Sequence, residues 1–277
     1  MSDAQAQAVA VSFARALAER RSAVLAGQMA LLVGIFAAWE GVAAAGWINP
    51  DLGGQPSAMW HAFVASAAAG ELWGHLKVTL YEEIVGFTIG TVAGVAIGLG
   101  LWWSRTASRV LEPFAVVFNG IPKIALAPPM IVWFGIYETS KIVLAATICV
   151  VVAWLAAYAG ARMADRDQLD MVRAMGGSRW QQFTKIVVPS SLSWIIAALK
   201  INIGFALVGA VVGEFVASNH GLGYMAVQAA ILFQMSQLWM VVFVIMAVAA
   251  AQYVLVLWLE RRLLARMGGE QQFAGRA

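Results

Sequence analysis

Long apolar runs separated by short polar stretches form the dominant pattern of this chain. A helix that spans a bilayer needs about 20 mostly apolar residues. Five segments meet that length with few charges: residues 27–47, 84–103, 142–161, 192–215 and 238–259. The pattern therefore predicts an all-α membrane protein.

A sixth apolar region, residues 110–136, is too long for one straight span. It contains Pro113, Pro122, Pro128 and Pro129. Because proline lacks a backbone donor and clashes with the preceding turn, a helix breaks there. We expect one broken span preceded by an interfacial turn, which gives six spans in all. A region that only re-enters the membrane, leaving five spans, is the alternative.

Basic residues indicate how the spans are oriented. With a cytoplasmic N-terminus, six spans place residues 1–26, 104–109, 162–190 and the chain after residue 259, including the tail 263–277, inside. All thirteen Arg residues then lie on the cytoplasmic side, in agreement with the positive-inside rule. We predict a transmembrane domain over residues 27–262 with both termini in the cytoplasm. The first 26 residues form either a surface helix or a frayed tail.

Composition supports a lipid environment and excludes several function classes. Hydrophobic residues make up 61% of the chain and charged residues 12%, with a mean hydropathy of +0.77. Soluble domains average about a quarter charged residues. The net charge of +3 is too small to indicate a nucleic-acid partner. The single Cys149 forms no disulfide within the chain, and the three His residues show no metal-binding spacing, so we expect no metal site.

Glycines recur every four residues within the second span, at Gly86, Gly90, Gly94 and Gly98. This spacing places them on one helix face, where missing side chains allow another helix to approach closely. We favour helix packing, within the bundle or across a dimer, over a pore-lining role.

Ionisable residues inside a bilayer are costly unless they are paired or face water. Lys200 and Glu214 fall within the fifth span. We expect Glu82 and Glu83 to lie just outside the second span, where solvation costs little. Glu214 is the candidate for the outer part of a translocation path, with a structural hydrogen bond as the alternative.

The longest polar interruption between spans, residues 162–190, alternates positive and negative charges around a few apolar residues. A short amphipathic helix with one apolar face is suited to insertion into a groove of a partner protein. Gly176 and Gly177 are expected to end this helix, since glycine readily adopts the left-handed conformation of a C-terminal cap. Pro189 then marks the start of the fifth span.

The spacing of this loop resembles the EAA loop of the membrane subunits of ABC importers, with the pattern E-A-A-x3-G-x9-I-x-L-P. The four residues that set the spacing are Asp170, Gly176, Ile186 and Pro189. Asp170 replaces the usual Glu, Met171 and Val172 replace the two Ala, and Val188 replaces Leu. The resemblance implies a cytoplasmic coupling helix that docks into an ATPase. Its coupling residues would be Asp170, Met171, Val172, Arg173, Gly176, Gly177, Trp180 and Pro189.

The proline-rich region resembles a second signature, P-x-x-A-x-A-P-x-x-I-x-W-F-G, which runs here from Pro122 to Gly135. It belongs to a permease family that serves nitrate, sulfonate and taurine importers, with relatives for bicarbonate and vitamin precursors. Interrupted spans mark translocation paths, so the candidate path residues are Asn119, Pro122, Lys123, Pro128 and Glu214. Lys123 replaces a second Pro of many anion-importing relatives, and it either attracts an anion or extends to the interface.

Together these resemblances imply a type I ABC importer permease in the bacterial inner membrane: six transmembrane helices with a cytoplasmic coupling helix. Implied partners are two ATPase subunits, a periplasmic solute-binding protein and a second copy of the chain, with a heterodimer as the alternative. The expected substrate is a small organic or inorganic anion, with an aromatic carboxylate or a vitamin precursor as the alternative.

The chain itself carries no sign of an enzyme. No G-x4-G-K-[ST] phosphate loop occurs, and no Lys follows a Gly. We therefore expect ATP and Mg to bind the partner ATPase, and no cofactor to bind this chain. An ion-driven secondary transporter, the competing class, would need paired carboxylates deep in several spans. A purely structural anchor does not explain the broken span.

Overall fold

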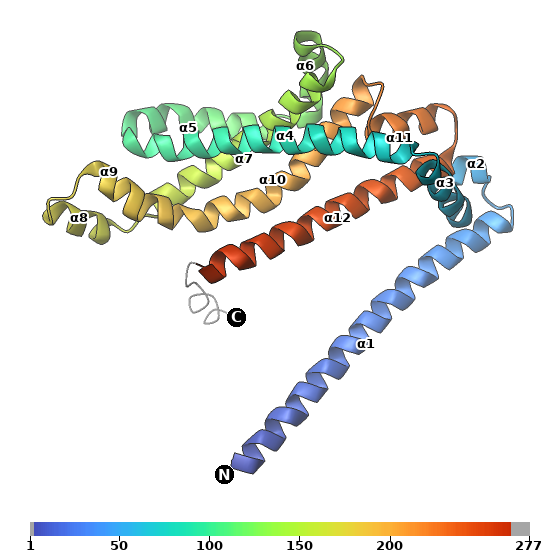
Figure 1. The fold of residues 1–277 in the computed structure, drawn as a ribbon, viewed down its shortest axis with the longest axis horizontal. Coiled ribbons are helices and arrows are strands. Elements are labelled where there is room, and N and C mark those ends of the chain that lie inside the picture. Colours follow the sequence, from blue (N-terminus) through green and yellow to red (C-terminus); the bar gives the residue numbers. More distant parts are fainter. Residues whose placement is uncertain (1–2, 267–277) are drawn as a thin grey trace.

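The computed structural model describes residues 3–266 of the chain, which are mostly helical with no strand in that range (Figure 1). Side chains are described for residues 23–262 except 25, 50 and 51, so predictions on residues 1–2 and 267–277, and on the side chains of Arg15, Arg20 and Arg21, lie outside the described residues. The five long helices are α1 (Asp3–Ala44), α4 (Glu71–Gly100), α7 (Glu138–Arg162), α10 (Val188–Val216) and α12 (Met235–Arg266). The all-α prediction is confirmed.

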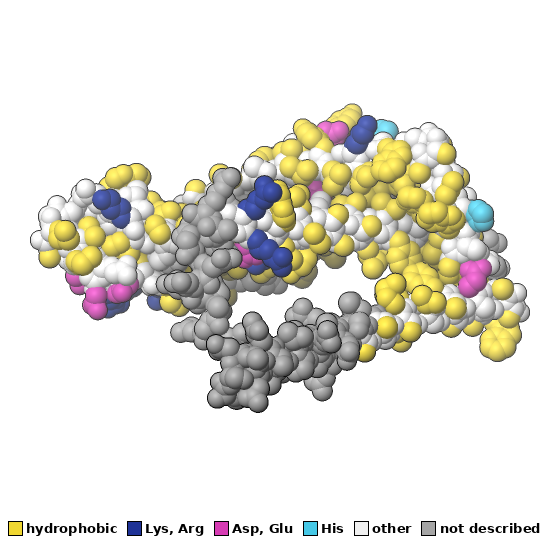
Figure 2. Space-filling view, turned by 60° about the horizontal axis from the view of Figure 1, so that its bottom comes forward, with side chains coloured by type: hydrophobic (Ala, Val, Ile, Leu, Met, Phe, Trp, Pro, Cys, Tyr) yellow, Lys and Arg dark blue, Asp and Glu magenta, His cyan; other side chains and the backbone are white. Residues whose placement is uncertain are grey.

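Shorter elements connect these helices. They are α2 (Pro50–Gly53), α3 (Pro56–Ala68), the 3-10 turns η1 (Leu101–Trp103) and η2 (Lys123–Leu126), α5 (Arg105–Gly120), α6 (Ala127–Phe134), α8 (Arg166–Ala174), α9 (Arg179–Gln182), the π-helix η3 (Phe183–Val187) and α11 (Leu222–Ile231). Figure 2 shows hydrophobic side chains spread along the described part of the visible face, with only a few charged side chains among them, as expected for a surface in contact with lipid.

The glycine stripe of α4 packs directly on α7. A Cβ atom added at Gly86 would lie 2.6 Å from the Cβ of Ala145, and one at Gly98 would lie 2.5 Å from the carbonyl oxygen of Trp154. Both separations are far below van der Waals contact, so only glycine permits this approach of two backbones. The packing role expected for the stripe is confirmed, and the partner helix lies within the same chain.

The order of these contacts shows that α4 and α7 run in the same direction. Gly86, at the middle of α4, faces Ala145 in the first third of α7, and Gly98 faces Ala157 near the end of both helices. The chain between them must therefore return to the side on which α4 begins. Residues 105–134 make that return, as two helical pieces bent by 97°. Among the described residues, five helices are long and apolar enough to cross a membrane, and the number is six if this bent pair is counted as one span.

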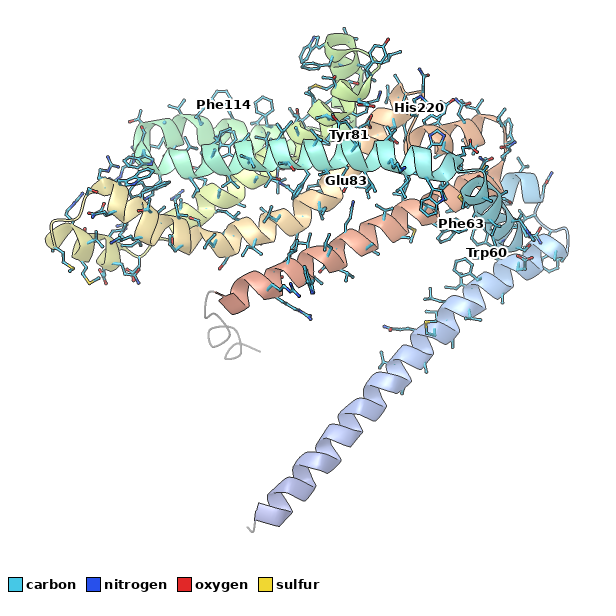
Figure 3. All side chains as sticks on the ribbon, viewed as in Figure 1. Trp60, Phe63, Tyr81, Glu83, Phe114 and His220 are labelled. Carbon is cyan, nitrogen blue, oxygen red and sulfur yellow. The ribbon has the colours of Figure 1, made fainter. Side chains whose placement is uncertain are left out.

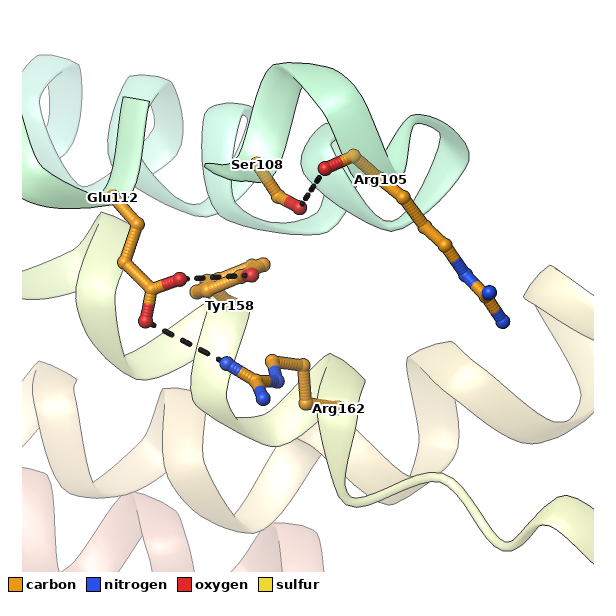
Figure 4. A network of polar contacts seen from close by, with 5 residues as sticks. All are labelled: Arg105, Ser108, Glu112, Tyr158 and Arg162. Atoms are coloured by element: carbon orange, nitrogen blue, oxygen red, sulfur yellow. Dashed lines mark hydrogen bonds and ion pairs between the residues drawn. The ribbon is translucent and has the colours of Figure 1, made fainter. Parts of the chain in front are cut away.

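The break in that returning segment lies at Ile121 and Pro122, between α5 and η2. Ile121 is extended, with φ −67° and ψ 131°, as expected for a residue that precedes proline. Pro113 is accommodated inside α5 without ending it. Figure 4 shows how α5 is held against α7: the carboxylate of Glu112 accepts a hydrogen bond from Tyr158 Oη at 3.4 Å and pairs with Arg162 at 3.5 Å.

α10 packs antiparallel on α7, with Gly213 against Lys141 at one end and Gly160 against Ser191 at the other. Between these ends, Asn202 donates to the hydroxyl of Thr91 at 3.1 Å and to the carbonyl of Cys149 at 3.0 Å. These bonds join α4, α7 and α10 at one level of the core.

α1 diverges from the bundle and meets it only near its end (Figure 1). There the rings of Trp39 and Trp239 meet edge to face at 5.5 Å. The carboxylate of Glu40 accepts hydrogen bonds from the Gln55 side chain at 2.7 Å and from the Ser57 backbone at 3.0 Å. These contacts tie the end of α1 to the connection that leads into α3.

The expectation that Glu82 and Glu83 lie outside the second span in contact with water is wrong. α4 begins at Glu71, and both carboxylates are only 1% exposed. Glu83 accepts a hydrogen bond from Gln252 of α12 at 2.7 Å, on the side of α4 that faces α12 in Figure 3. Burial in protein, rather than position along the helix, removes these charges from lipid.

Candidate coupling loop and translocation segment

α8 is a short amphipathic helix at the end of the bundle reached by α7. The Asp165 side chain caps it by accepting a hydrogen bond from the Asp167 backbone at 2.9 Å. Leu169 and Val172 pack inward on a small core that includes Ala164, Ile186 and Val187. The remaining face is open, and Met171 and Met175 are 57% and 80% exposed. The amphipathic helix expected in this loop is confirmed.

The two glycines end α8 as expected. Gly176 is left-handed, with φ +76°. Its N–H donates to the Arg173 carbonyl at 3.0 Å, and the Gly177 N–H donates to the Val172 carbonyl at 2.8 Å. This pair of bonds is a Schellman motif, which satisfies carbonyls that the helix would otherwise leave without donors.

The chain then restarts at α9 through a capping box. Ser178 N–H donates to Gln181 Oε1 at 2.7 Å, and Gln181 N–H donates back to Ser178 Oγ at 3.2 Å. Gln182 reaches from α9 to the carbonyl of Leu169 in α8 at 2.9 Å. The loop is therefore a compact unit whose two helices are fixed to each other.

Most of the predicted coupling residues lie on the outside of this unit. Val172 and Gly177 are partly buried within it. The exposed residues are Asp170, Met171, Arg173, Gly176, Trp180 and Pro189. Charged and apolar side chains of this loop and of the start of α10 are therefore exposed and available to a partner.

Four of the five predicted path residues lie together at the proline-broken segment. Lys123 Nζ donates to the carbonyl of Asn119 at 3.0 Å across the break, and it lies 5.9 Å from the ring centre of Phe205 in α10. Asn119, Pro122 and Pro128 are exposed. Lys123 therefore stands at the bend, between the broken segment and α10.

One face of α6 anchors the segment, and the other is open. Ala127 and Met130 pack on Leu144 and Ile148 of α7. The opposite face is strongly apolar, and Val132 is 81% exposed. Within this single chain, the broken segment presents an apolar face that no other described element covers.

Glu214, the fifth predicted path residue, lies apart from the other four. It is 1% exposed, accepts a hydrogen bond from Thr79 Oγ1 at 2.7 Å and accepts another from the Gly223 N–H at 2.5 Å. Thr79 in turn accepts from the Leu222 N–H at 2.8 Å. This geometry favours the structural alternative, in which Glu214 holds the start of α11 against α4 and α10.

Two further charges meet at Glu214, and sequence analysis did not single out their association. Lys141 is 1% exposed and donates to the carbonyls of Ile136 and Tyr137. The buried carboxylate of Glu82 lies close enough to interact electrostatically with both Glu214 and Lys141. The three residues belong to three helices, so only the helix register brings them together.

The fold and the exposed loop define a multi-pass α-helical membrane permease. The family model described as "Binding-protein-dependent transport system inner membrane component" matches residues 86–268. The chain belongs to this family and is a membrane permease subunit of an ABC transporter.

Relatives of known designation support this assignment. The chain is 31% identical over 199 residues to a protein of Escherichia coli (strain K12) named as an aliphatic sulfonates transport permease protein, SsuC, covering 72% of this chain and 76% of the relative. It is 28% identical to the Bacillus subtilis (strain 168) protein of the same designation, covering 83% of each chain. The taurine transport system permease protein TauC of Escherichia coli (strain K12) is 29% identical over 57% of this chain and 58% of its own.

Solved structures of the same architecture confirm the fold. An inward-facing structure of the MetNI methionine ABC transporter matches with a TM-score of 0.59 and 20% identity, covering 70% of this chain and 94% of that one. An amino acid ABC transporter matches with a TM-score of 0.55 and 20% identity, covering 72% and 96%. The predicted type I importer permease fold is confirmed at this level.

Proposed function

We propose that this chain forms the membrane path of an ATP-driven importer for a small anion, with sulfonates such as taurine as the first candidates. The observation that carries the proposal is the coupling loop. α8 is rigidly capped at both ends, fixed to α9, and open on its outer face. A partner ATPase that binds this face would transmit its motion to the membrane helices on which α8 packs.

The partners follow from what the single chain leaves uncovered. Two ATPase subunits would supply ATP hydrolysis, and ATP and Mg would bind there. A second copy of this chain would cover the apolar face of α6, since a two-fold pair places the same patch on both subunits. The path would then run along the two-fold axis, between the broken segments and α10.

The orientation follows from the Arg residues of the loop. Arg166, Arg173 and Arg179 lie in the α8–α9 unit, and the positive-inside rule places it in the cytoplasm. Both termini are then cytoplasmic, and a periplasmic binding protein would deliver the substrate to the opposite end, where α3 and α11 lie. Domain closure of the ATPases would rock the two bundles between inward-facing and outward-facing states.

The anion assignment rests on Lys123 and on the designations of the sulfonate and taurine relatives. A cation at the bend of a broken span suits a substrate with a negative charge. A vitamin precursor is the second candidate, since a formylaminopyrimidine transport permease protein, ThiX, of Halalkalibacterium halodurans is 32% identical over 150 residues. An ion-driven secondary transporter is disfavoured by the family assignment.

The test is to purify the chain with its ATPase and binding protein in lipid nanodiscs and to measure ATP hydrolysis. Taurine, alkanesulfonates, nitrate and formylaminopyrimidine would be added one at a time. Stimulation by one of them identifies the substrate, and Gly176→Pro should abolish it. Failure of any ATPase to associate with the chain would overturn the proposal.

A further inference from the structure

Five residues form a cluster, here named the aromatic junction, where the end of α4 meets the coupling loop. They are Trp102 and Trp103 of η1, Arg179 and Trp180 of α9, and Phe183 at the start of the π-helix. The guanidinium carbon of Arg179 lies 5.5 Å from the ring centres of both Trp102 and Trp103. Its Nη2 donates to the Trp103 carbonyl at 3.3 Å.

The rings of the junction also contact one another across the two segments. Phe183 lies 5.6 Å from Trp102 and 5.4 Å from Trp103 between ring centres, and Trp180 lies 6.1 Å from Trp103. These separations fall within the range of favourable aromatic pairs. The end of α4 is therefore held to the loop by several rings and one cation.

The junction continues into the packing beneath α8. Trp102 and Phe183 share one apolar core with Leu169 and Val172 of α8. Gln182, adjacent to Phe183, bonds to the Leu169 carbonyl at 2.9 Å. A displacement of α8 thus acts on the end of α4 through side-chain packing as well as on α10 through the backbone.

The backbone connection from the loop to α10 passes through the π-helix Phe183–Val187. π-helical turns are rare and frequently lie at functional sites, and helices kink at them. If motion of α8 reached the membrane helices only through this π-helical turn, part of the motion would be absorbed by bending at the turn. The junction bypasses the turn and reaches α4, whose glycine stripe is packed rigidly on α7.

We propose that the aromatic junction is a second mechanical link, which transmits motion of the coupling loop to α4, and that Arg179 is the positioning residue that holds it together. This inference rests on the proposed function, because it assumes that an ATPase moves α8. It differs from a role as a membrane-interface anchor, for which Trp residues are common, because an anchor needs no contact between Arg179 and Trp103.

The test is hydrogen exchange on the full chain bound to its ATPase in nanodiscs, without nucleotide and after trapping with Mg-ATP and vanadate. In the wild type, trapping should change exchange at least threefold in peptides covering α8 and in peptides covering residues 99–104. In Arg179→Met, the response of α8 should remain while that of residues 99–104 is lost. Arg179→Lys, which keeps the cation, should restore part of the response.

The matched control is Arg109→Met, which removes an exposed Arg of α5 outside the junction and should behave as the wild type. A second variant, Trp103→Leu, removes a ring without changing charge and should reproduce the loss seen with Arg179→Met. Nucleotide-free exchange identical to the wild type shows that the variants fold normally.

Two results would overturn the inference, and they differ in what else they overturn. The junction alone is overturned if α8 responds to trapping and residues 99–104 of both Arg179→Met and Trp103→Leu still respond as in the wild type. It is also overturned if α8 of the wild type responds and its residues 99–104 do not. Absence of any α8 response in the wild type overturns the proposed function as well.

Discussion

The α4–α7 interface and the proline-broken segment that follows α4 differ in how closely their backbones pack against the rest of the chain. Along α4, a glycine every fourth residue brings two backbones into contact, and a Cβ atom at Gly94 would lie 2.7 Å from that of Ala153. In the next segment, Pro122 breaks the helix and leaves an apolar face uncovered. The first region, here named the α4–α7 frame, is packed within one chain, whereas the second leaves an apolar face that the proposed second copy would cover.

The largest expected effect comes from adding a side chain to the closely packed α4–α7 interface. Gly94→Leu places a side chain where the α7 backbone already lies, and overpacking of this kind costs about 1–3 kcal/mol or more. We expect loss of a monodisperse protein in detergent and of membrane-inserted protein, measured by size-exclusion chromatography and membrane fractionation. Gly100→Leu, on the same helix with no atom within 4 Å of the added Cβ, is the control. Equal yields of both variants would show that the frame is not tightly packed.

The next effect concerns the hydrogen bonds that hold α11 against α4 and α10, at the end of the bundle opposite the coupling loop. Glu214→Ala leaves the buried Gly223 N–H without its acceptor, which costs about 1–3 kcal/mol. It also removes the shorter of the two hydrogen bonds that the Thr79 hydroxyl donates, the other being to the His75 carbonyl at 3.3 Å. We expect a clearly lowered thermal unfolding midpoint in detergent. Glu138→Ala, an exposed carboxylate in the first turn of α7, should change the midpoint little. A Glu214→Ala midpoint equal to that of the wild type would contradict the structural role of this carboxylate.

A smaller effect is expected from a change in the coupling loop that leaves the α4–α7 packing untouched. Gly176→Ala forces a side chain into a left-handed position, which costs roughly 1–2 kcal/mol, so the Schellman cap loosens while the bundle stays intact. We expect substrate-stimulated ATP hydrolysis to fall about tenfold, since 1.4 kcal/mol corresponds to a factor of ten. Gly176→Asn should retain most of the activity, because Asn tolerates this conformation. Equal losses in both variants would point to a side-chain clash with the ATPase instead.

The smallest effect concerns the broken segment. Lys123→Met removes the cation at the bend, and a partly exposed charge contributes about 0.2–1 kcal/mol. We expect anion uptake into proteoliposomes to fall a few fold, and the loss to shrink at high salt. Lys77→Met, an exposed Lys at the start of α4, serves as the control for net charge. Uptake unchanged in Lys123→Met would assign Lys123 to the interface rather than to the path.

The sequence predicts best those features that depend on local spacing. The amphipathic pattern and glycine pair of residues 166–177 specify α8 and its end, because capping is decided within a few residues. The glycine stripe likewise marks a close contact, although its partner, α7, is not readable from α4 alone.

Features that depend on helix register were missed for a physical reason. Burial of Glu82 and Lys141 requires three helices to be aligned, and no pattern within one of them reports that alignment. The break itself follows from local sequence, since α5 accommodates Pro113 and ends at Gly120, next to Pro122. The coupling and path roles of the predicted residues stay predictions, and only their placement is known.

Docking of an ATPase on α8 is the central claim, and cysteine cross-linking tests it most directly. The only cysteine, Cys149, is fully buried, so Met175→Cys introduces one reactive thiol on the exposed face of α8. With a short bifunctional reagent on the assembled complex, Met175→Cys should cross-link to the ATPase, and Val64→Cys on α3 at the opposite end should not. A cross-link from Val64→Cys, or none from Met175→Cys in a complex that still hydrolyses ATP, would contradict the account.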